Sequence, residues 1–241
     1  MIRIENLSKD FGNVKAVIDL NLEIKKGEFF AFLGPNAAGK TTTIKLMTGL
    51  LRPTKGKVFI GGYDIQTQGY EAKRFIGYIP EYPYFYDRLT AREFIKFITQ
   101  VYNLNDLRIS DKIEEMFKLF GLDDYKDTLI GDFSHGLRQR LLYVATLIHE
   151  PQVLIIDEPL IALDPQAARL VKNILKEKSR QGITIFMSTH ILSIAEELAD
   201  KIAIIDKGLL VAEGSFQELK KISPADKNLE DVFLRLTRGL T

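Results

Sequence analysis

The most constraining feature of this sequence is the glycine-rich segment Gly34–Thr41, GPNAAGKT, which fits the pattern G-x-x-x-x-G-K-[ST]. In such a loop successive backbone N–H groups point at phosphate oxygens, and the helix that follows turns its partially positive N-terminus toward the same anion. The required context is present, because an apolar run at 28–33 predicts a buried strand and residues 41–50 predict a helix. We therefore predict a strand–loop–helix unit that binds phosphate groups through Gly34, Pro35, Asn36, Ala37, Ala38, Gly39, Lys40, Thr41 and Thr42.

Three side chains of this segment have separate predicted roles. We expect Lys40 to reach the β- and γ-phosphates of a nucleoside triphosphate, Thr41 to ligate Mg²⁺, and Thr42 to contact the α-phosphate. Ala37 stands where glycine is usual, and if this residue has a positive φ, alanine costs on the order of 1 kcal/mol. The alanine removes no phosphate ligand, so phosphate binding is still expected.

A second apolar run, at 153–156, ends in the carboxylates of Asp157 and Glu158. A strand here delivers Asp157 to the carboxyl edge of a sheet, where ligands of open α/β folds bind and where the carboxylate can hold Mg²⁺. Glu158 is then placed to orient and deprotonate an attacking water. The alternative is that the two acids only cap the following turn, but the phosphate-binding segment in the same chain favours the catalytic interpretation.

His190 follows another strand-like stretch, residues 185–189. A lone histidine after a strand is more often structural than catalytic. At the edge that carries the other carboxyl ends, however, His190 can donate a hydrogen bond to a γ-phosphate and respond to its loss.

The hydrophobic pattern predicts an α/β organisation. Strands near the N-terminus and at 57–60, 153–156, 183–187 and 202–205 alternate with helices, which implies a parallel sheet covered on both faces. The elements between 89 and 149 are instead helical and begin at a capping box, Thr90–Glu93. We therefore predict one domain over 1–241, with a core of 1–88 and 150–221, a helical insertion of 89–149 and a C-terminal helical tail of 222–241.

Composition excludes several classes of protein. A formal net charge of +1 over 241 residues gives no electrostatic argument for a nucleic-acid partner. The lack of cysteine excludes disulfides, thiolate metal sites and thiol catalysis. No apolar stretch approaches the roughly 18 residues that span a bilayer, and the N-terminal segment has no signal-peptide character. Any work at a membrane is therefore expected from the cytoplasm and through a partner.

The segment Phe133–Arg140, FSHGLRQR, resembles the signature sequence Leu-Ser-Gly-Gly-x-x-Gln-Arg of the ATP-binding cassette family. Other motifs of that family follow in the family's order. Phe11 stands where an aromatic ring stacks on adenine, 76–81 resembles the Q-loop, Ala162–Pro165 matches the D-loop, and His190 matches the switch histidine. The resemblance covers essentially the whole chain. It implies the α/β fold of P-loop NTPases: a mostly parallel sheet core, an N-terminal antiparallel β subdomain and an inserted α-helical subdomain.

The resemblance further implies an ATPase that uses ATP and Mg²⁺ and has two kinds of protein partner. In this family two cassettes pair head to tail, and each binds ATP against the other's signature. A transmembrane permease subunit is the second partner, which would make this chain cytoplasmic and peripheral on the inner face of the cell membrane. The motif positions imply catalytic roles for Glu158, His190 and Glu81, metal ligation by Thr41, Glu81 and Asp157, and contact with the partner's ATP by Ser134, His135, Gly136 and Asp164. Whether the second cassette is a copy of this chain or a different one stays open.

Two residues depart from the family pattern. His135 replaces the first signature glycine, so its side chain either crowds the phosphate or, when protonated, adds an attractive charge. Glu81 replaces the usual glutamine of the Q-loop, and its oxygen can still ligate Mg²⁺. Because neither change removes Lys40, Glu158 or His190, hydrolysis is still expected.

Four aromatic residues follow Glu81 closely, in the segment EYPYFY at 81–86. Aromatic residues on loops are favoured as interface anchors, and cassettes of this family receive a coupling helix from the membrane subunit near the Q-loop. The alternative, equally open, is that these rings pack the helical insertion onto the core. The final segment, 228–236, predicts a short amphipathic helix and resembles the tails of bacterial export-type cassettes for drugs, antibiotics, ions or polysaccharides.

Two other functions compete with transport. A cassette ATPase of the translation, chromosome or repair type would carry a second P-loop or long heptad repeats, and this sequence has neither. A degenerate cassette that binds ATP without hydrolysing it is opposed by the presence of Glu158 and His190.

Overall fold

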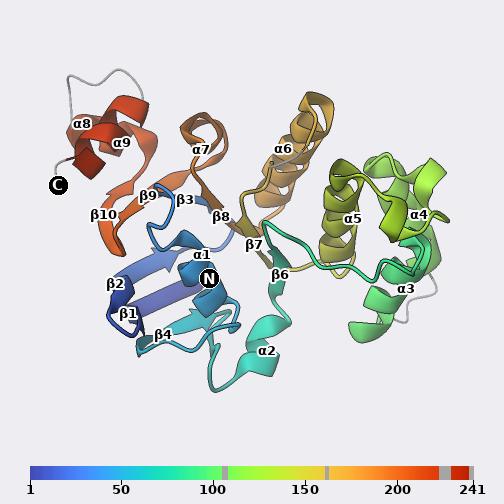
Figure 1. Cartoon of the computed structure of the whole chain (residues 1–241), viewed down its shortest axis with the longest axis horizontal. Helices are drawn as coiled ribbons and strands as arrows, with labels where there is room; N and C mark the ends of the chain where they lie inside the picture. The colour runs from blue at the N-terminus through green and yellow to red at the C-terminus, as the bar shows by residue number, and fades with distance from the viewer. Residues whose placement is uncertain (105–107, 161–162, 223–228, 239–241) are drawn as a thin grey trace. The chain divides into compact units, whose positions relative to one another are not determined.

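The computed structural model describes residues 1–104, 108–160, 163–222 and 229–238 of the chain (Figure 1). The chain divides into two compact units. The first unit comprises Met1–Tyr78, Gln152–Pro159 and Lys176–Thr241, and the second comprises Ile79–Pro151 and Leu160–Leu175. No helix in the described part of the chain is long and apolar enough to cross a bilayer.

The first unit begins with a four-stranded antiparallel sheet in the order β2-β1-β4-β5. Buried and exposed side chains alternate along its strands, as in a sheet with only one face in the core. The predicted N-terminal β elements are therefore confirmed. The strands are β1 (Ile2–Phe11), β2 (Val14–Ile24), β4 (Lys55–Ile60) and β5 (Tyr63–Asp64).

The second sheet of this unit has the order β10-β9-β3-β8-β7-β6 and a parallel centre. Strands β9, β3, β8 and β7 run parallel to their neighbours, whereas β10 pairs antiparallel with β9 at the edge. Every residue of β3, β7 and β8 is buried, which agrees with a sheet covered on both faces. The strands are β3 (Phe29–Leu33), β6 (Ile76–Ile79), β7 (Val153–Asp157), β8 (Thr184–Thr189), β9 (Lys201–Asp206) and β10 (Leu209–Gly214).

Helix α1 (Lys40–Met47) lies between the two sheets, and α7 (Leu192–Leu198) lies on the other side of the six-stranded sheet (Figure 1). The buried residues Ile44, Leu46 and Met47 of α1 share one apolar core with inward-facing residues of both sheets. The helix that follows the phosphate-binding segment is thus enclosed on two sides. The remaining helices of the first unit are α2 (Gly69–Lys73), α8 (Phe216–Ile222) and α9 (Leu229–Arg238).

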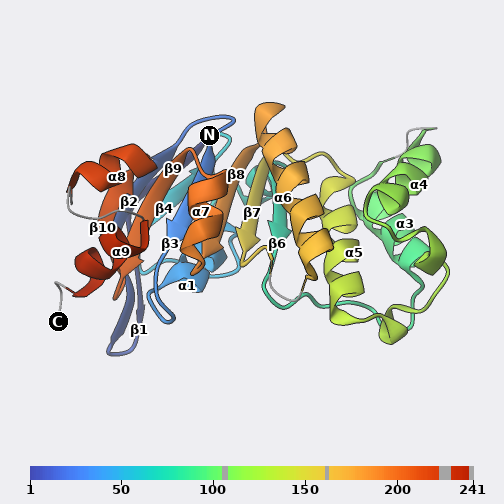
Figure 2. The same ribbon diagram turned by 90° about the horizontal axis from the view of Figure 1, so that it is seen from above.

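The second unit is built from helices, seen as the green and yellow ribbons α3, α4 and α5 in Figure 2. Its core includes the stacked rings of Phe120 and Tyr143, whose centroids are 5.9 Å apart. The capping box at Thr90 is confirmed, because Thr90 and Glu93 exchange hydrogen bonds between side chain and backbone. The elements are α3 (Ala91–Val101), α4 (Ile109–Leu119), η1 (Asp123–Tyr125), η2 (Ile130–Asp132), α5 (His135–Leu147) and the start of α6 (Pro165–Arg180), which ends in the first unit.

The division into compact units does not show what each part of the chain binds. The assignment of 1–88 and 150–221 to an ATP-binding core, and of 89–149 to a signature subdomain, therefore stays a prediction. The predicted tail of 222–241 contains α9, while residues 223–228 and 239–241 lie outside the described residues.

Candidate active site

The parallel register aligns three segments at one edge of the six-stranded sheet. Leu33 of β3 pairs with Thr189 of β8, and Asp157 of β7 pairs with Ser188 of β8. The residues that follow these strand ends, beginning with Gly34, Glu158 and His190, therefore leave the sheet at its carboxyl edge. The prediction that the strand delivers Asp157 to this edge is confirmed.

The loop after β3 presents backbone donors that the described protein does not use. No described residue accepts a hydrogen bond from the amides of Asn36, Ala37 or Gly39, and α1 begins without a side-chain cap. An uncapped helix N-terminus preceded by free amides is a binding site for an anion such as phosphate. A Cβ on Gly39 would lie 2.4 Å from the carbonyl oxygen of Ala16, so only glycine permits this close passage.

Lys40 is buried at the start of α1, although it is charged. Its Nζ donates to the carbonyl oxygens of Gly34, at 2.7 Å, and Pro35, at 3.1 Å. These contacts hold the ammonium group within the loop, where it can exchange a carbonyl for a phosphate oxygen. Thr41 is exposed and Thr42 is half-buried in the same helical turn.

Ala37 has a φ of 64°, so the condition for backbone strain is met. An L-residue with a side chain pays about 1–2 kcal/mol in this left-handed region, whereas glycine does not.

We expect Ala37→Gly to raise the free energy of unfolding by about 0.5–1 kcal/mol, since relief of strain exceeds the extra freedom that glycine gives the unfolded chain. Urea denaturation monitored by circular dichroism measures this change. Ala38→Gly is the matched control: Ala38 is buried and is not among the residues with positive φ, so its replacement should lower stability. Equal losses in both variants would contradict the prediction.

Asp157 is buried, and its Oδ1 accepts a hydrogen bond from the hydroxyl of Ser188. No described residue donates to Asp157 Oδ2. Burial, together with the nearby Asp157 carboxylate, raises the pKa of Tyr78 to about 12, so the phenol stays protonated beside this carboxylate at neutral pH.

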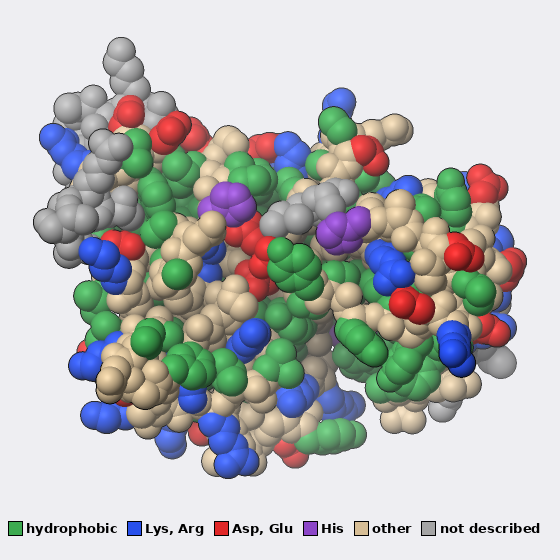
Figure 3. Space-filling view, viewed as in Figure 1, with side chains coloured by type: hydrophobic (Ala, Val, Ile, Leu, Met, Phe, Trp, Pro, Cys, Tyr) green, Lys and Arg blue, Asp and Glu red, His purple; other side chains and the backbone are tan. Residues whose placement is uncertain are grey.

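Glu158 contacts the last residue of β8, Thr189, and the residue that follows it, His190. Its Oε1 lies 2.8 Å from His190 Nδ1, and its Oε2 accepts a hydrogen bond of 3.2 Å from the hydroxyl of Thr189. Figure 3 shows acidic side chains gathered next to a histidine on this face of the first unit. Glu158 also has a φ of 53°, and such strain is found disproportionately at functional sites.

Ser188 and Thr189 are members of this site that the sequence patterns did not predict. Both are fully buried hydroxyl residues at the end of an apolar strand, directly before His190. Two consecutive hydroxyl residues at the carboxyl end of a strand could have indicated their role, because hydroxyl groups can donate hydrogen bonds that fix neighbouring carboxylates.

The signature residues belong to the second unit. Ser134 is the N-cap of α5, and its Oγ accepts a hydrogen bond from the amide of Leu137 at 3.3 Å. His135 is exposed, Gly136 is half-buried, and the first turn of α5 has no acidic residue. This helix end therefore presents an uncompensated positive potential.

Asp164 and Glu81 also lie in the second unit. Asp164 caps α6 through a 2.8 Å hydrogen bond from the amide of Ala167, and this bond lowers the pKa of the carboxyl group. Glu81 is half-buried just after β6. Ala162 of the predicted D-loop lies outside the described residues.

Phe11 is half-exposed at the end of β1, where Lys9 Nζ lies 5.0 Å from the centroid of its ring. An exposed, flat ring can stack on a base without displacing core packing. The predicted role of Phe11 as an adenine platform stays a prediction.

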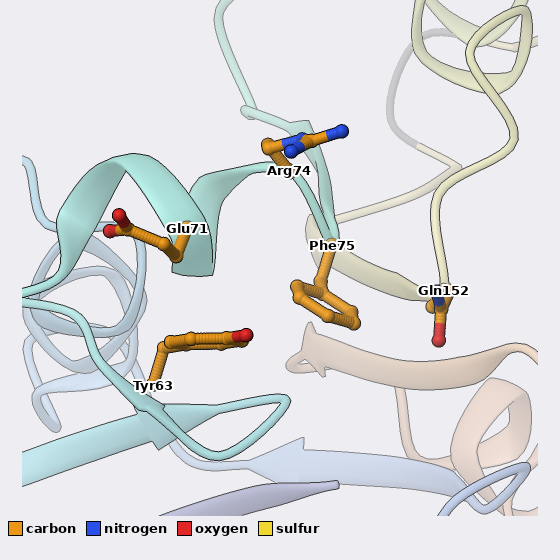
Figure 4. Close-up of a pocket in the computed structure, with 5 residues that line it drawn as sticks. All are labelled: Tyr63, Glu71, Arg74, Phe75 and Gln152. Carbon is orange, nitrogen blue, oxygen red and sulfur yellow. The ribbon is translucent and has the colours of Figure 1, made fainter.

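A pocket of about 330 Å³ lies away from this edge (Figure 4). Phe75 directly precedes β6 and Gln152 directly precedes β7, and the Gln152 amide donates to the Phe75 carbonyl at 3.0 Å. The pocket therefore opens at the amino ends of these strands, opposite the strand ends that carry Asp157. Its lining residues are Tyr63, Glu71, Arg74, Phe75 and Gln152.

The geometry agrees with comparisons to known proteins. A family model described as ABC transporter matches residues 17–161. The bacitracin transport ATP-binding protein BcrA of Bacillus licheniformis is 40% identical over 225 residues, which span 92% of this chain and 72% of that relative. The chain belongs to the ABC transporter family.

Two further comparisons extend the similarity over the whole chain. The ABC transporter ATP-binding protein NatA of Bacillus subtilis (strain 168) is 34% identical over 247 residues, and the match covers all of both proteins. A solved structure described as an ATP binding subunit of an ABC transporter is 29% identical, with a TM-score of 0.92 over 98% of this chain and 99% of that one.

Family membership confirms several predictions together. The chain is the ATP-binding and ATP-hydrolysing subunit of an ABC transporter, and its fold is that of a P-loop NTPase. Its similarity to the bacitracin relative agrees with the predicted resemblance to bacterial export-type cassettes.

Proposed function

We propose that this ABC subunit binds ATP with Mg²⁺, pairs head to tail with a second cassette, and drives export through a separate membrane subunit. The observation that carries the proposal is the row of strand ends that places the phosphate-binding loop, Asp157, Glu158 and His190 at one edge of one sheet. The direct test is phosphate release from ATP by the purified chain. A chain that binds ATP but releases phosphate no faster than its Glu158→Gln variant contradicts the proposal.

The loop residues bind and orient the triphosphate in this proposal. The free amides at 36, 37 and 39 and the N-terminus of α1 donate to phosphate oxygens, and Lys40 supplies a buried positive charge to the β- and γ-phosphates. Thr42 contacts the α-phosphate, and Phe11 stacks on adenine. Remaining loop residues Gly34, Pro35 and Ala38 shape the cradle.

Glu158 acts as the general base. Its carboxylate is held by Thr189 and His190, so the oxygen that accepts the water proton has a defined direction. His190 is exposed on its other side and donates a hydrogen bond to the γ-phosphate, which ties the position of the base to the presence of that phosphate. Glu81, from the second unit, completes the predicted catalytic set.

The proposed Mg²⁺ ligands are oxygen donors, as this ion prefers. Asp157 Oδ1 is fixed by Ser188 while Oδ2 has no donor among the described residues, so this carboxylate fits a metal or its bound water. The hydroxyl of Thr41 and the carboxylate of Glu81 are the other proposed ligands. When bound, Mg²⁺ neutralises charge on the triphosphate.

The second cassette is implied by the chemistry of α5. Ser134, Gly136 and the partial positive charge of the helix N-terminus form an anion site in the second unit, and in the proposed pair they contact the γ-phosphate held by the partner's loop. His135 either narrows this site or, when protonated, strengthens it, and Asp164 lies at the same interface. Homodimer and heterodimer are both compatible with this arrangement.

The membrane partner is a transmembrane permease, which would hold the chain on the cytoplasmic face of the membrane. Export is proposed because the chain is similar to a bacitracin transport subunit. The aromatic segment at 82–86 offers two different surfaces. Tyr84 is 89% exposed, whereas Phe85 is 5% exposed and packs edge-on against Phe94 with centroids 5.2 Å apart. Phe85 therefore contributes to packing within the second unit, whereas Tyr84 is accessible to a partner.

We expect Tyr84→Ser to leave the fold intact and to weaken capture of the membrane subunit by about 30-fold, as the loss of an interface anchor does. Phe85→Ser should instead lower the free energy of unfolding by about 3–5 kcal/mol. Co-purification with the membrane subunit and thermal unfolding measure the two effects.

Tyr70→Ser is the control, since Tyr70 is also largely exposed but lies on α2 of the first unit. If Tyr70→Ser weakens capture as much as Tyr84→Ser, the docking role of the 82–86 segment is wrong.

A further inference from the structure

Two chain segments of the second unit run side by side between the aromatic residues at 82–86 and the N-terminus of α5. The Gly131 amide donates to the Asp87 carbonyl at 3.0 Å, and the Ile130 amide donates to the Leu89 carbonyl at 2.9 Å. Thr90 and Leu129 form an antiparallel bridge just beyond. One of these segments follows Tyr86 directly, and the other leads within three residues to Ser134.

Arg138, the fourth residue of α5, fastens the helix to both segments. Its Nη1 lies 2.9 Å from Asp87 Oδ1, and its other two nitrogens donate to the carbonyl oxygens of Gly131, at 3.3 Å, and Phe133, at 3.4 Å. A single planar guanidinium group thus contacts the aromatic-side segment, the signature-side segment and the residue before the N-cap.

Arg138 lies near a helix N-terminus, where positively charged side chains are usually avoided. A positive charge near a helix N-terminus is unfavourable, and the first turn of α5 has no acidic residue to compensate it. Asp87 supplies the opposite charge from outside the helix. An unfavourable positive charge beside a predicted anion site indicates that this arrangement serves a function.

We propose that Asp87 and Arg138 are positioning residues, which set the place of the α5 N-terminus relative to the aromatic segment and so couple membrane-subunit docking to the site for the partner's ATP. The inference rests on the proposed function of Ser134 and of the aromatic segment. Both residues belong to the second unit, whereas the phosphate-binding loop belongs to the first, so we expect their effect on turnover after ATP has bound.

A second arginine–aspartate pair, Arg92 and Asp127, serves as a matched control. Arg92 Nε lies 2.9 Å from Asp127 Oδ1, the same distance as in the Arg138–Asp87 pair. The side-chain exposures are 27% and 73% for Arg92 and Asp127, against 26% and 60% for Arg138 and Asp87. The Arg92–Asp127 pair therefore has a similar distance and exposure and involves no residue of α5, and Arg92 also pairs with Glu114.

The test compares Asp87→Ala with Asp127→Ala and with the conservative variant Asp87→Glu. We expect Asp87→Ala to lower kcat for ATP about 5-fold to 10-fold with KM changed less than about 2-fold, because the signature is displaced while the chain's own loop is intact. Asp127→Ala should keep kcat, and Asp87→Glu should restore most of it. Melting temperatures of the two alanine variants should agree within about 3 °C.

Hydrogen exchange of the nucleotide-free chain gives a second readout that needs no hydrolysis. Amides 134–139 should exchange about 10-fold faster in Asp87→Ala and unchanged in Asp127→Ala. Equal exchange and equal kcat in the two alanine variants overturn the inference. Failure of the proposed function is distinct, since it would appear as hydrolysis that persists in Glu158→Gln.

Discussion

Replacing Glu158 by glutamine lowers the rate of ATP hydrolysis by about 100-fold or more and leaves ATP bound. The amide cannot take a proton from water, and general-base groups contribute about 10²–10⁴ in rate. Folding is preserved, because glutamine has the shape of glutamate and its oxygen can still accept the hydrogen bond that Thr189 donates. Phosphate release and binding of a fluorescent ATP analogue measure the two quantities.

Glu196→Gln is the control for this variant. Glu196 is an exposed carboxylate on α7, so its neutralisation should leave the hydrolysis rate unchanged. Hydrolysis at the wild-type rate in Glu158→Gln would show that Glu158 is not the base, and loss of nucleotide binding would show that it does more than take a proton. Binding of ATP without hydrolysis by the unaltered chain would instead support the degenerate-cassette alternative.

Replacing Lys40 by alanine weakens binding of ATP by about 10-fold to 100-fold and abolishes measurable turnover. Hydrogen bonds from a charged donor contribute about 1.5–3 kcal/mol, which corresponds to that range of affinity. The loop carbonyls of Gly34 and Pro35 lose their donor at the same time, so the cradle is also less well ordered. Isothermal titration with ATP measures the change.

Lys45→Ala separates a local role of Lys40 from a general effect of charge. Lys45 lies five residues later on α1 and is exposed, so its loss should change the affinity for ATP by less than about 2-fold. Equal losses of affinity in both lysine variants would remove the special role assigned to Lys40.

The sequence predicted the elements whose signals are local. The phosphate-binding loop, the capping box at Thr90, and the apolar strands β3, β7 and β8 all follow from short patterns, and the structure contains each of them. Strand β10 was missed because its apolar run, LLVA, is only four residues long and lacks the alternation of a half-buried edge strand. Strand β6 was missed because its four residues were interpreted only as part of the Q-loop.

The site was predictable only as far as strand order could be inferred. Asp157, Glu158 and His190 could be assigned to one edge because parallel strands share a carboxyl side. The contacts that orient them, from Ser188 and Thr189, depend on which strands are neighbours in the sheet, and the sequence contains no direct record of that pairing. The roles of the individual site residues remain predictions until the variants are measured.

The enclosure of α1 between two sheets has a thermodynamic consequence for nucleotide capture. Since Ile44, Leu46 and Met47 tie this helix into the main apolar core, the donors at its N-terminus are already fixed before any phosphate arrives. A receptor that is ordered in advance loses little conformational entropy when its ligand binds. In the proposed pair of cassettes, more of the interaction energy of the triphosphate then remains to draw the second subunit into place.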